Sequence, residues 1–219
     1  MKLALLLDFD GTVTERDIGD LVVNKFAIPD QRDAEGEYRR GEISLRELWA
    51  HEMGRLRSID EPKMIEFARQ EARIRPGLTE LAGYCSNNNI PVEIASSGIR
   101  FYIDVVLEKA GLTGLPVASP DAAYDENGLG LLKFKDGLRD CANTAMCKCE
   151  RVWARRRAGR RVVFVGDGAS DYCAALQADH IVAREALARY CTRAGVPFSP
   201  FEDFHDVLGI LRDLAEYAG

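Results

Sequence analysis

The sequence has no stretch that could cross a membrane and no excess of positive charge. None of its 219 residues belong to an apolar run close to the roughly 20 residues that span a bilayer. Lys and Arg total 29 against 35 Asp and Glu, so the net charge is −6 and no basic field attracts nucleic acid or anionic lipid. We therefore expect a globular protein without membrane or nucleic-acid partners. Nothing in the sequence indicates its oligomeric state.

Paired cysteines of the kind found in zinc sites are missing as well. Zinc sites favour cysteine pairs separated by a few residues, with a second pair of ligands further along the chain. Only Cys141, Cys147 and Cys149 form a loose cluster, and no histidine is near it. We interpret the cysteines as small apolar side chains. A structural metal at the cluster is the alternative.

The N-terminus has only a superficial likeness to a secretory signal. Lys2 is followed by an apolar run, but the run ends at Leu7 before Asp8 and lacks a small-residue cleavage site. A buried strand explains the run better. We therefore expect a cytoplasmic protein whose thiols are reduced.

Apolar patterning predicts an α/β fold with a doubly wound parallel sheet, because strand and helix patterns alternate. Continuous aliphatic runs indicate strands buried on both faces; they are Leu3–Leu7, Pro91–Ala95, Val162–Val165 and His180–Ala183. Helical patterns lie between and after them, at Leu78–Asn88, Arg100–Lys109, Cys149–Ala158, Ser170–Gln177, Arg184–Ala194 and Glu202–Tyr217.

The distance between the first two strands predicts an inserted subdomain. A βαβ unit takes about 30 residues, yet Leu7 and Pro91 are more than 80 positions apart. The excess carries helical patterns at Asp17–Phe26, Ser44–Leu56 and Glu61–Arg73, and Ser44 with Glu47 forms a capping box. We therefore predict a helical cap at residues 17–74 and a core domain at residues 1–16 and 75–219. A small β-hairpin is predicted around the tight-turn pair Asn127-Gly128.

Polar residues follow the predicted strands where the chain leaves the sheet. Ligands of open α/β sheets bind beyond the carboxyl ends of the strands, so residues at these positions are candidates for a site. They are Asp8 and Asp10 after the first strand, Ser96, Ser97 and Gly98 after the second, and Asp167 and Asp171 after the third. Four carboxylates at one edge repel one another unless a cation lies among them. Oxygen ligands of this kind suit magnesium.

This set of residues can perform phosphoryl transfer, which needs an in-line nucleophile, charge neutralisation and a proton for the leaving group. Either Asp8 or Asp10 can attack phosphorus while the other reaches the leaving oxygen. Ser97 and Gly98 leave room for backbone N–H groups to approach a phosphate at the start of a helix, and Ser96 adds a hydroxyl.

The sequence Asp8-Phe9-Asp10-Gly11-Thr12, followed by Ser96, a lysine and Gly166-Asp167-Gly168-x-x-Asp171, resembles the haloacid dehalogenase superfamily of phosphatases. The resemblance implies a Rossmann-like core, Mg²⁺ and an aspartyl-phosphate intermediate. It implies that Asp8 is the nucleophile and a metal ligand, and that Asp10 is the general acid and base and offers its backbone carbonyl to the metal. Ser96 would bind the phosphoryl group, Asp167 would be a metal ligand, and Asp171 would support the metal site.

The family's lysine, which binds phosphate and offsets the charge of the nucleophile, has three candidates. Lys148 fits best, because it stands before a predicted helix about 18 residues ahead of the last motif. Lys133 and Lys135 are the alternatives, in or just after the predicted hairpin.

Within the superfamily, the inserted cap is similar to that of the phosphoserine phosphatase-like branch, and closest to methionine-salvage phosphatases. Those enzymes act on a diketo- or hydroxyketo-methylthiopentane phosphate. The similarity rests on Arg75-Pro76-Gly77, on the segment Ser96–Phe101 and on Cys147-Lys148. Two features depart from that branch, since Cys149 stands where proline is usual and the cysteine cluster is thinner.

Phosphoserine phosphatase is the main alternative. In that family an acidic residue after the first motif, with an aromatic residue and an arginine in the cap, holds the amino acid. Asp17 could supply the acid, or could simply cap a helix. Leu45 and Glu52 align best with the cap positions, so the arginine is missing. Another small phosphomonoester is a further possibility; a phosphomutase or a non-enzymatic phosphate sensor is more remote.

Two further groups of residues have a structural and a functional interpretation. Arginines gather between Arg151 and Arg161, and we interpret them as a solvated helix face; nucleic-acid binding is the functional alternative. On the second cap helix, Trp49, Met53 and Leu56 could line the substrate pocket or pack within the cap.

Overall fold

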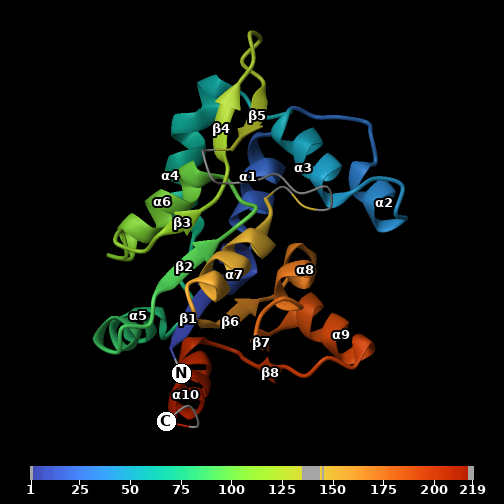
Figure 1. Ribbon diagram of the computed structural model, residues 1–219. Coiled ribbons are helices and arrows are strands. Elements are labelled where there is room, and N and C mark those ends of the chain that lie inside the picture. Colours follow the sequence, from blue (N-terminus) through green and yellow to red (C-terminus); the bar gives the residue numbers. More distant parts are fainter. Residues whose placement is uncertain (1, 135–143, 145, 217–219) are drawn as a thin grey trace.

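The computed structural model describes residues 2–134, 144 and 146–216, and it is built around a six-stranded parallel sheet. The strand order is β3-β2-β1-β6-β7-β8, with β1 beside the middle of the sheet (Figure 1). The strands are β1 (Leu3–Leu7), β2 (Val92–Ala95), β3 (Val117–Ala118), β6 (Arg161–Gly166), β7 (His180–Ala183) and β8 (Ser199–Pro200). All four predicted strands are confirmed. The two strands that the sequence did not indicate, β3 and β8, are two residues long and carry no readable pattern.

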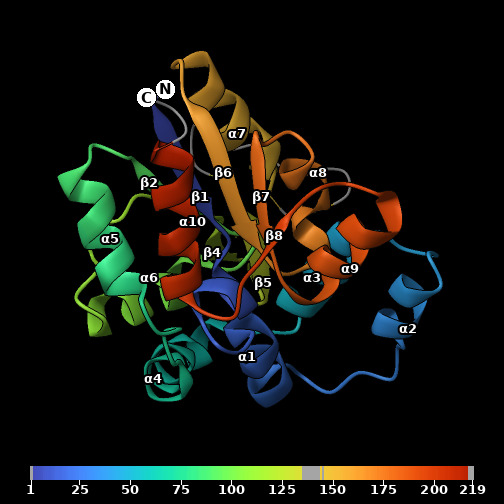
Figure 2. The same cartoon turned by 90° about the horizontal axis from the view of Figure 1, so that it is seen from below.

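Helices cover both faces of the sheet, as the predicted doubly wound fold requires. Leu3, Leu5 and Leu7 of β1 face one hydrophobic core, which includes residues of α5, α6 and α10. Leu6 faces the opposite core, formed with α7, α8 and α9. Figure 2 shows α5 and α10 side by side on the first face. These helices are α5 (Leu78–Asn87), α6 (Arg100–Lys109), α7 (Lys148–Arg157), α8 (Tyr172–Ala175), α9 (Glu185–Ala194) and α10 (Phe204–Glu216).

The predicted helix at Ser170–Gln177 is shorter in the structure. The chain forms a 3₁₀ turn at Ala169–Asp171, and α8 is a single turn after it. The carboxylate of Asp171 accepts hydrogen bonds from the N–H groups of Asp167 and Gly168, both at 3.0 Å. This local bonding tightens the segment into a turn that the helical pattern alone did not indicate.

Residues 17–74 contain the three helices that the sequence predicts. They form α1 (Ile18–Phe26), α2 (Ala34–Arg39), α3 (Leu45–Met53), a 3₁₀ turn (Ser58–Asp60) and α4 (Glu61–Glu71). The predicted capping box is present, since Ser44 accepts from the N–H of Glu47 and the Glu47 carboxylate accepts from the N–H of Ser44. The sequence did not predict α2, which is short and buries only Ala34.

The two chain segments that join the cap helices to the sheet lie side by side. Thr14 and Ile74 form an isolated antiparallel bridge. Arg75 fixes this junction, because its buried guanidinium donates to the carbonyls of Gly11, Thr12 and Thr14, and also to that of Glu202.

Gly77 explains another part of the Arg75-Pro76-Gly77 motif. Its φ is 85°, in the left-handed region that favours glycine, and a Cβ there would lie 2.6 Å from the backbone nitrogen of His205. The motif is therefore needed for the backbone path between the cap and α5, and for the close approach of α10.

The predicted hairpin is present and lies against the cap. It consists of β4 (Asp121–Tyr124) and β5 (Gly130–Lys133), which pair in antiparallel fashion. The N–H of Gly130 donates to the carbonyl of Leu56, and Tyr124 Oη donates to Glu61 Oε2 at 2.5 Å. In Figure 1 the hairpin stands next to α3 and α4. A segment far along the chain thus supports the cap.

The interpretation of the six arginines as a solvated helix face is wrong for four of them. Arg160 and Arg161 lie beyond the end of α7, and Arg161 begins β6. Arg151 and Arg155 of α7 bind the carboxylate of Glu93, at 2.6 and 2.7 Å. Glu93 lies on β2 and its side chain is only 3% exposed, so the two arginines neutralise a charge inside the fold. The sequence pattern missed this because Glu93 is remote from α7 along the chain.

The described helices include none that combines the length and apolar character needed to cross a membrane. Cys147 and Cys149 are partly buried, and Cys141 lies outside the described residues. Within the described residues, the one group of three or more side chains arranged to hold a metal contains no cysteine.

The hydrogen bonds of Arg75 lead to a stability prediction. Arg75→Met keeps the length of the side chain but leaves four carbonyls without their donor. We expect the free energy of unfolding, measured by urea denaturation, to fall by about 2–4 kcal/mol. The matched control is Arg16→Met, whose exposed guanidinium is 3.7 Å from Glu71 and should matter by less than about 0.5 kcal/mol. Equal losses in the two variants would contradict this account of the junction.

Candidate active site

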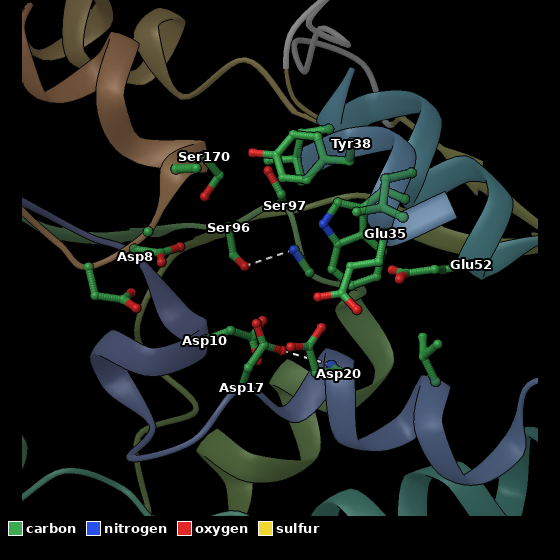
Figure 3. Close-up of a pocket in the computed structure, with 18 of the residues that line it drawn as sticks. Asp8, Asp10, Asp17, Asp20, Glu35, Tyr38, Glu52, Ser96, Ser97 and Ser170 are labelled. Atoms are coloured by element: carbon green, nitrogen blue, oxygen red, sulfur yellow. Dashed lines mark hydrogen bonds between the residues drawn. The ribbon is translucent and has the colours of Figure 1, made fainter. Parts of the chain in front are cut away.

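A cavity of about 390 Å³ lies between the carboxyl ends of the strands and the cap helices (Figure 3). The core contributes side chains that follow β1, β2 and β6, including Asp8, Asp10, Ser96, Ser97 and Ser170. The opposite wall comes from α1, α2 and α3, including Asp20, Glu35, Tyr38, Trp49 and Glu52. The predicted site residues from remote parts of the sequence are therefore brought to one place.

Asp8 is buried at the end of β1, the strand beside the middle of the sheet. Its N–H donates to the carbonyl of Val165, which extends the pairing of β1 with β6 by one residue. Its side chain accepts a hydrogen bond of 2.5 Å from Lys148 Nζ, and only 7% of that Asp8 side chain is exposed. The ordering of β1 thus fixes the direction of the Asp8 carboxylate.

Lys148 is the first residue of α7, and its ammonium group connects three parts of the site. Besides Asp8, it donates to Asp171 Oδ1 at 2.7 Å and to Ser170 Oγ at 3.1 Å. Burial alone would lower the pKa of Lys148, but the charges of Asp171 and Asp8 raise it above its usual value. Of the alternatives, Lys133 is exposed at the end of β5 and Lys135 lies outside the described residues.

Asp8, Asp167 and Asp171 each place one carboxylate oxygen within 4.8 Å of the others. Thr12 Oγ1 holds Asp167 Oδ1 at 2.8 Å, and backbone amides hold Asp171. These contacts orient the carboxylates before any ligand arrives. The group could hold a metal ion, because its ligands are all hard oxygen atoms.

The electrostatics of this group fit a divalent cation. Burial, followed by the charge of Asp171, raises the pKa of Asp8 well above its usual value. The same two causes raise the pKa of Asp167 to about 6. Three carboxylates face the single ammonium of Lys148, so two negative charges lack compensation from it. A divalent cation among them would supply that compensation.

Asp10 lies apart from the three-carboxylate group and has different partners. Tyr102 Oη donates to Asp10 Oδ2 at 2.8 Å, while the N–H groups of Ile18 and Gly19 donate to Oδ1 at 2.9 and 3.4 Å. Burial raises the pKa of Asp10 to about 6, although these three hydrogen bonds favour the ionised form. The different environments of Asp8 and Asp10 suit them to different roles.

The Ser96–Gly98 loop is buried beside Asp8 and Asp10. The N–H of Gly98 donates to Ser96 Oγ at 2.9 Å, as the dashed line in Figure 3 shows. Ser97 Oγ is buried and has no hydrogen-bond partner among the described residues. A Cβ at Gly98 would overlap Tyr102 Oη and would lie 2.5 Å from Asp10 Oδ2. Glycine at position 98 therefore also allows close packing against Tyr102 and Asp10, in addition to the predicted approach of a phosphate.

Asp17 caps a helix, as one of its two sequence interpretations expected, and it also lines the cavity. Its side chain accepts from the N–H of Asp20 at 2.8 Å and so caps α1. Burial, and then the charge of Asp10, raises its pKa well above the usual value. Burial beside Asp10 therefore favours the neutral acid form of Asp17 at the junction between the cap and the core.

The three residues of the second predicted cap helix that could line the substrate pocket differ in position. Trp49 lines the cavity, whereas Met53 and Leu56 are fully buried and pack within the hydrophobic core. Leu45 and Glu52, the cap positions considered for phosphoserine, also line the cavity.

Three other lining residues, Glu35, Tyr38 and Arg39, were missed because α2 was missed. The available signal was Asp33, which caps that helix by accepting from the N–H of Gly36. Arg39 is exposed and paired with Glu35.

A family model described as "Putative Phosphatase" matches residues 3–189. The chain belongs to this family. A curated relative from Brevibacillus brevis, named 2-hydroxy-3-keto-5-methylthiopentenyl-1-phosphate phosphatase, is 31% identical over 98% of this chain and 97% of its own length. A relative of the same name from Exiguobacterium sibiricum is 30% identical, with full coverage of both chains.

Solved structures agree with the fold. One titled as a phospho-aspartyl intermediate analogue of phosphoserine phosphatase has a TM-score of 0.69 at 18% identity and covers 95% of this chain and 98% of its own. A substrate-bound phosphoserine phosphatase complex has a TM-score of 0.67 at 16% identity and covers 96% and 98%. The predicted resemblance to haloacid dehalogenase phosphatases, and the class of enzyme, are thus confirmed.

The contacts of Lys148 lead to a second stability prediction. In Lys148→Met, Asp8 and Asp171 lose a buried cationic partner, so without added metal we expect a loss of about 3–5 kcal/mol in the free energy of unfolding. Denaturant titration measures this loss. Lys133→Met is the control, because it removes an exposed lysine and should change the stability little. If the two variants were equally stable, the buried ion pairs would not have the importance assigned to them here.

Proposed function

We propose that the protein is a magnesium-dependent phosphatase that hydrolyses a small phosphate monoester through an aspartyl-phosphate on Asp8. The contact of Asp8 with Lys148 carries this proposal most directly. It holds a buried carboxylate in a fixed direction at the floor of a cavity, beside a second acid and an acidic cluster that suits a cation. The family membership of the chain supports the same reaction class.

The protein side chains would divide the reaction between them. A carboxylate oxygen of Asp8 forms a bond to phosphorus while the ester P–O bond breaks, and Asp10 gives a proton to the departing alcohol. Water then attacks the aspartyl-phosphate, Asp10 takes its proton, and inorganic phosphate leaves. Ser96, together with backbone N–H groups of Ser97 and Gly98, would bind the phosphoryl oxygens, and Lys148 would offset the charge of Asp8.

The acidic residues would hold the magnesium ion beside the nucleophile. Asp8, Asp167 and Asp171 supply carboxylate oxygens, and Asp10 supplies its backbone carbonyl. When bound, Mg²⁺ would neutralise negative charge on the transferring phosphoryl group and on the carboxylates around it.

For the substrate, we propose the hydroxyketo-methylthiopentenyl phosphate named for the relatives, or a close analogue. The cap side of the cavity combines apolar side chains, such as Leu45, Leu48 and Trp49, with carboxylates. The apolar side chains suit a methylthio tail, and the carboxylates can accept hydrogen bonds from hydroxyl groups. We place the reaction in the cytoplasm, the compartment that the N-terminal sequence predicts.

Phosphoserine is the second candidate, and Arg39 is the observation in its favour. Arg39 lines the cavity and could face a substrate carboxylate, as sequence analysis required of a cap arginine. Its guanidinium is already paired with Glu35, however, and carboxylates of Asp20 and Glu52 share the wall. Burial, and then the charge of Asp20, raises the pKa of Glu52 to about 7. This wall opposes a leaving group that carries a carboxylate, as serine does, so we favour the methylthiopentenyl substrate.

Replacement of the proposed nucleophile gives the first activity prediction. With Mg²⁺ and para-nitrophenyl phosphate, Asp8→Asn should release phosphate more slowly by on the order of 10³-fold or more, because an amide cannot form the acyl-phosphate. Chelation of the metal should abolish the wild-type reaction. Asp104→Asn, at an exposed position on α6, is the control that should retain activity. Full activity of Asp8→Asn would refute the proposed mechanism.

The acidic wall gives a prediction about selectivity. Phosphoserine and phosphoethanolamine differ by one carboxylate, so their kcat/KM values compare the same ester with and without an added negative charge. We expect phosphoethanolamine to be favoured roughly 10-fold or more, which is about 1.4 kcal/mol of repulsion. Glu52→Gln should narrow the difference at neutral pH. A preference for phosphoserine would instead support the second candidate.

A further inference from the structure

The carboxyl group of Asp10 is held between the core and the cap. On one side, Tyr102 of α6 donates its hydroxyl hydrogen to Oδ2 at 2.8 Å. On the other side, the first two N–H groups of α1 donate to Oδ1, from Ile18 at 2.9 Å and from Gly19 at 3.4 Å. Both oxygens of the proposed proton donor therefore have fixed partners, and those partners belong to different parts of the fold.

The ring of Tyr102 is fixed by packing. The residue is fully buried, lies edge-on to Phe101 at a centroid distance of 5.7 Å, and contacts Phe9 at 6.3 Å. Glycines surround its hydroxyl, since a Cβ at Gly98 would overlap Oη and one at Gly19 would lie 3.0 Å from it. Few other positions are open to this hydroxyl, so it holds Asp10 with little further loss of side-chain freedom.

A hydroxyl suits a partner whose protonation changes during a reaction. Backbone N–H groups can only donate, so they bind best to an ionised carboxylate. A tyrosine hydroxyl can donate to the carboxylate and can also accept from a carboxylic acid. Of the three partners of Asp10 described above, only Tyr102 can stay hydrogen-bonded whichever oxygen carries the proton.

We propose that Tyr102 is a positioning residue that fixes the Asp10 carboxyl for proton transfer to the leaving alcohol. This inference rests on the proposed function, in which Asp10 is the general acid and base. Tyr102 itself does not exchange a proton with the substrate; it acts through Asp10. Because the same carboxyl holds the start of α1, the hydroxyl also fixes the proton donor relative to the cap.

The test compares leaving groups that need a proton with leaving groups that do not. Tyr102→Phe removes the hydroxyl and keeps the ring. With β-glycerophosphate, whose alkoxide must be protonated, we expect kcat/KM to fall roughly 10-fold or more. With para-nitrophenyl phosphate, whose phenolate leaves readily, we expect a change of about 2-fold or less. Equal losses with the two esters, or no loss with either, would overturn the proposal.

Two further variants separate positioning from a general effect on structure. Tyr124→Phe is the matched control, because it also removes a hydroxyl that donates to a carboxylate, that of Glu61, but it lies outside the cavity. It should leave both rates unchanged. In the Asp10→Asn background, Tyr102→Phe should cause no additional loss with β-glycerophosphate. If Tyr102→Phe caused the same fold loss in the Asp10→Asn background as in the wild type, Tyr102 would act independently of Asp10.

Folding and the proposed function are checked separately. Thermal unfolding shows whether Tyr102→Phe is folded. If it is not, Gly19→Ala, whose Cβ would lie 3.0 Å from Tyr102 Oη and 2.7 Å from the ring of Trp49, should cause the same leaving-group-selective loss, whereas Trp49→Phe should not. Para-nitrophenyl phosphate hydrolysis that depends on Asp8 shows that the proposed function holds. In that case, equal fold losses with the two esters in Tyr102→Phe or Gly19→Ala would reject the positioning role alone. A wild-type enzyme inactive on both esters would reject the proposed function and this role with it.

Discussion

The site depends on the ammonium group of Lys148, which lies between the carboxylates of Asp8 and Asp171. Burying a charge this deeply costs on the order of several kcal/mol unless nearby partners compensate it. The three elements that carry these residues must therefore meet in one arrangement. Asp8 ends β1, Lys148 begins α7, and Asp171 closes the turn after β6. The same contacts that orient the Asp8 carboxylate thus link the two halves of the sheet.

A second constraint is the junction of the cap with the core. Arg75 holds the carbonyls of the loop that carries Gly11 and Thr12, while Asp10 in that loop holds the first turn of α1. The loop after β1 is therefore both the floor of the cavity and the attachment point of the cap. This arrangement explains why acidic residues of the cap, such as Asp17 and Asp20, lie close to the carboxylate of Asp10.

The sequence predicts the sheet, the cap helices and the residues at the strand ends, because long apolar runs and motif spacing are local signals. It does not predict β3, β8 or α2, since each is short and depends on neighbours remote in the chain. The partners of buried charges also cannot be identified from the sequence alone. Glu93 bound by Arg151, and Asp10 bound by Tyr102, become apparent only once β2, α6 and α7 are packed together.

The most direct test of the central claim is chemical trapping of the phosphorylated enzyme. Protein quenched during turnover with Mg²⁺ and substrate is reduced with borohydride, which converts an aspartyl-phosphate to homoserine, and its peptides are sequenced by mass spectrometry. We predict that Asp8 is converted to homoserine, and that the conversion requires both substrate and metal. Conversion of Asp10 or another carboxylate, with Asp8 unmodified, would contradict the account.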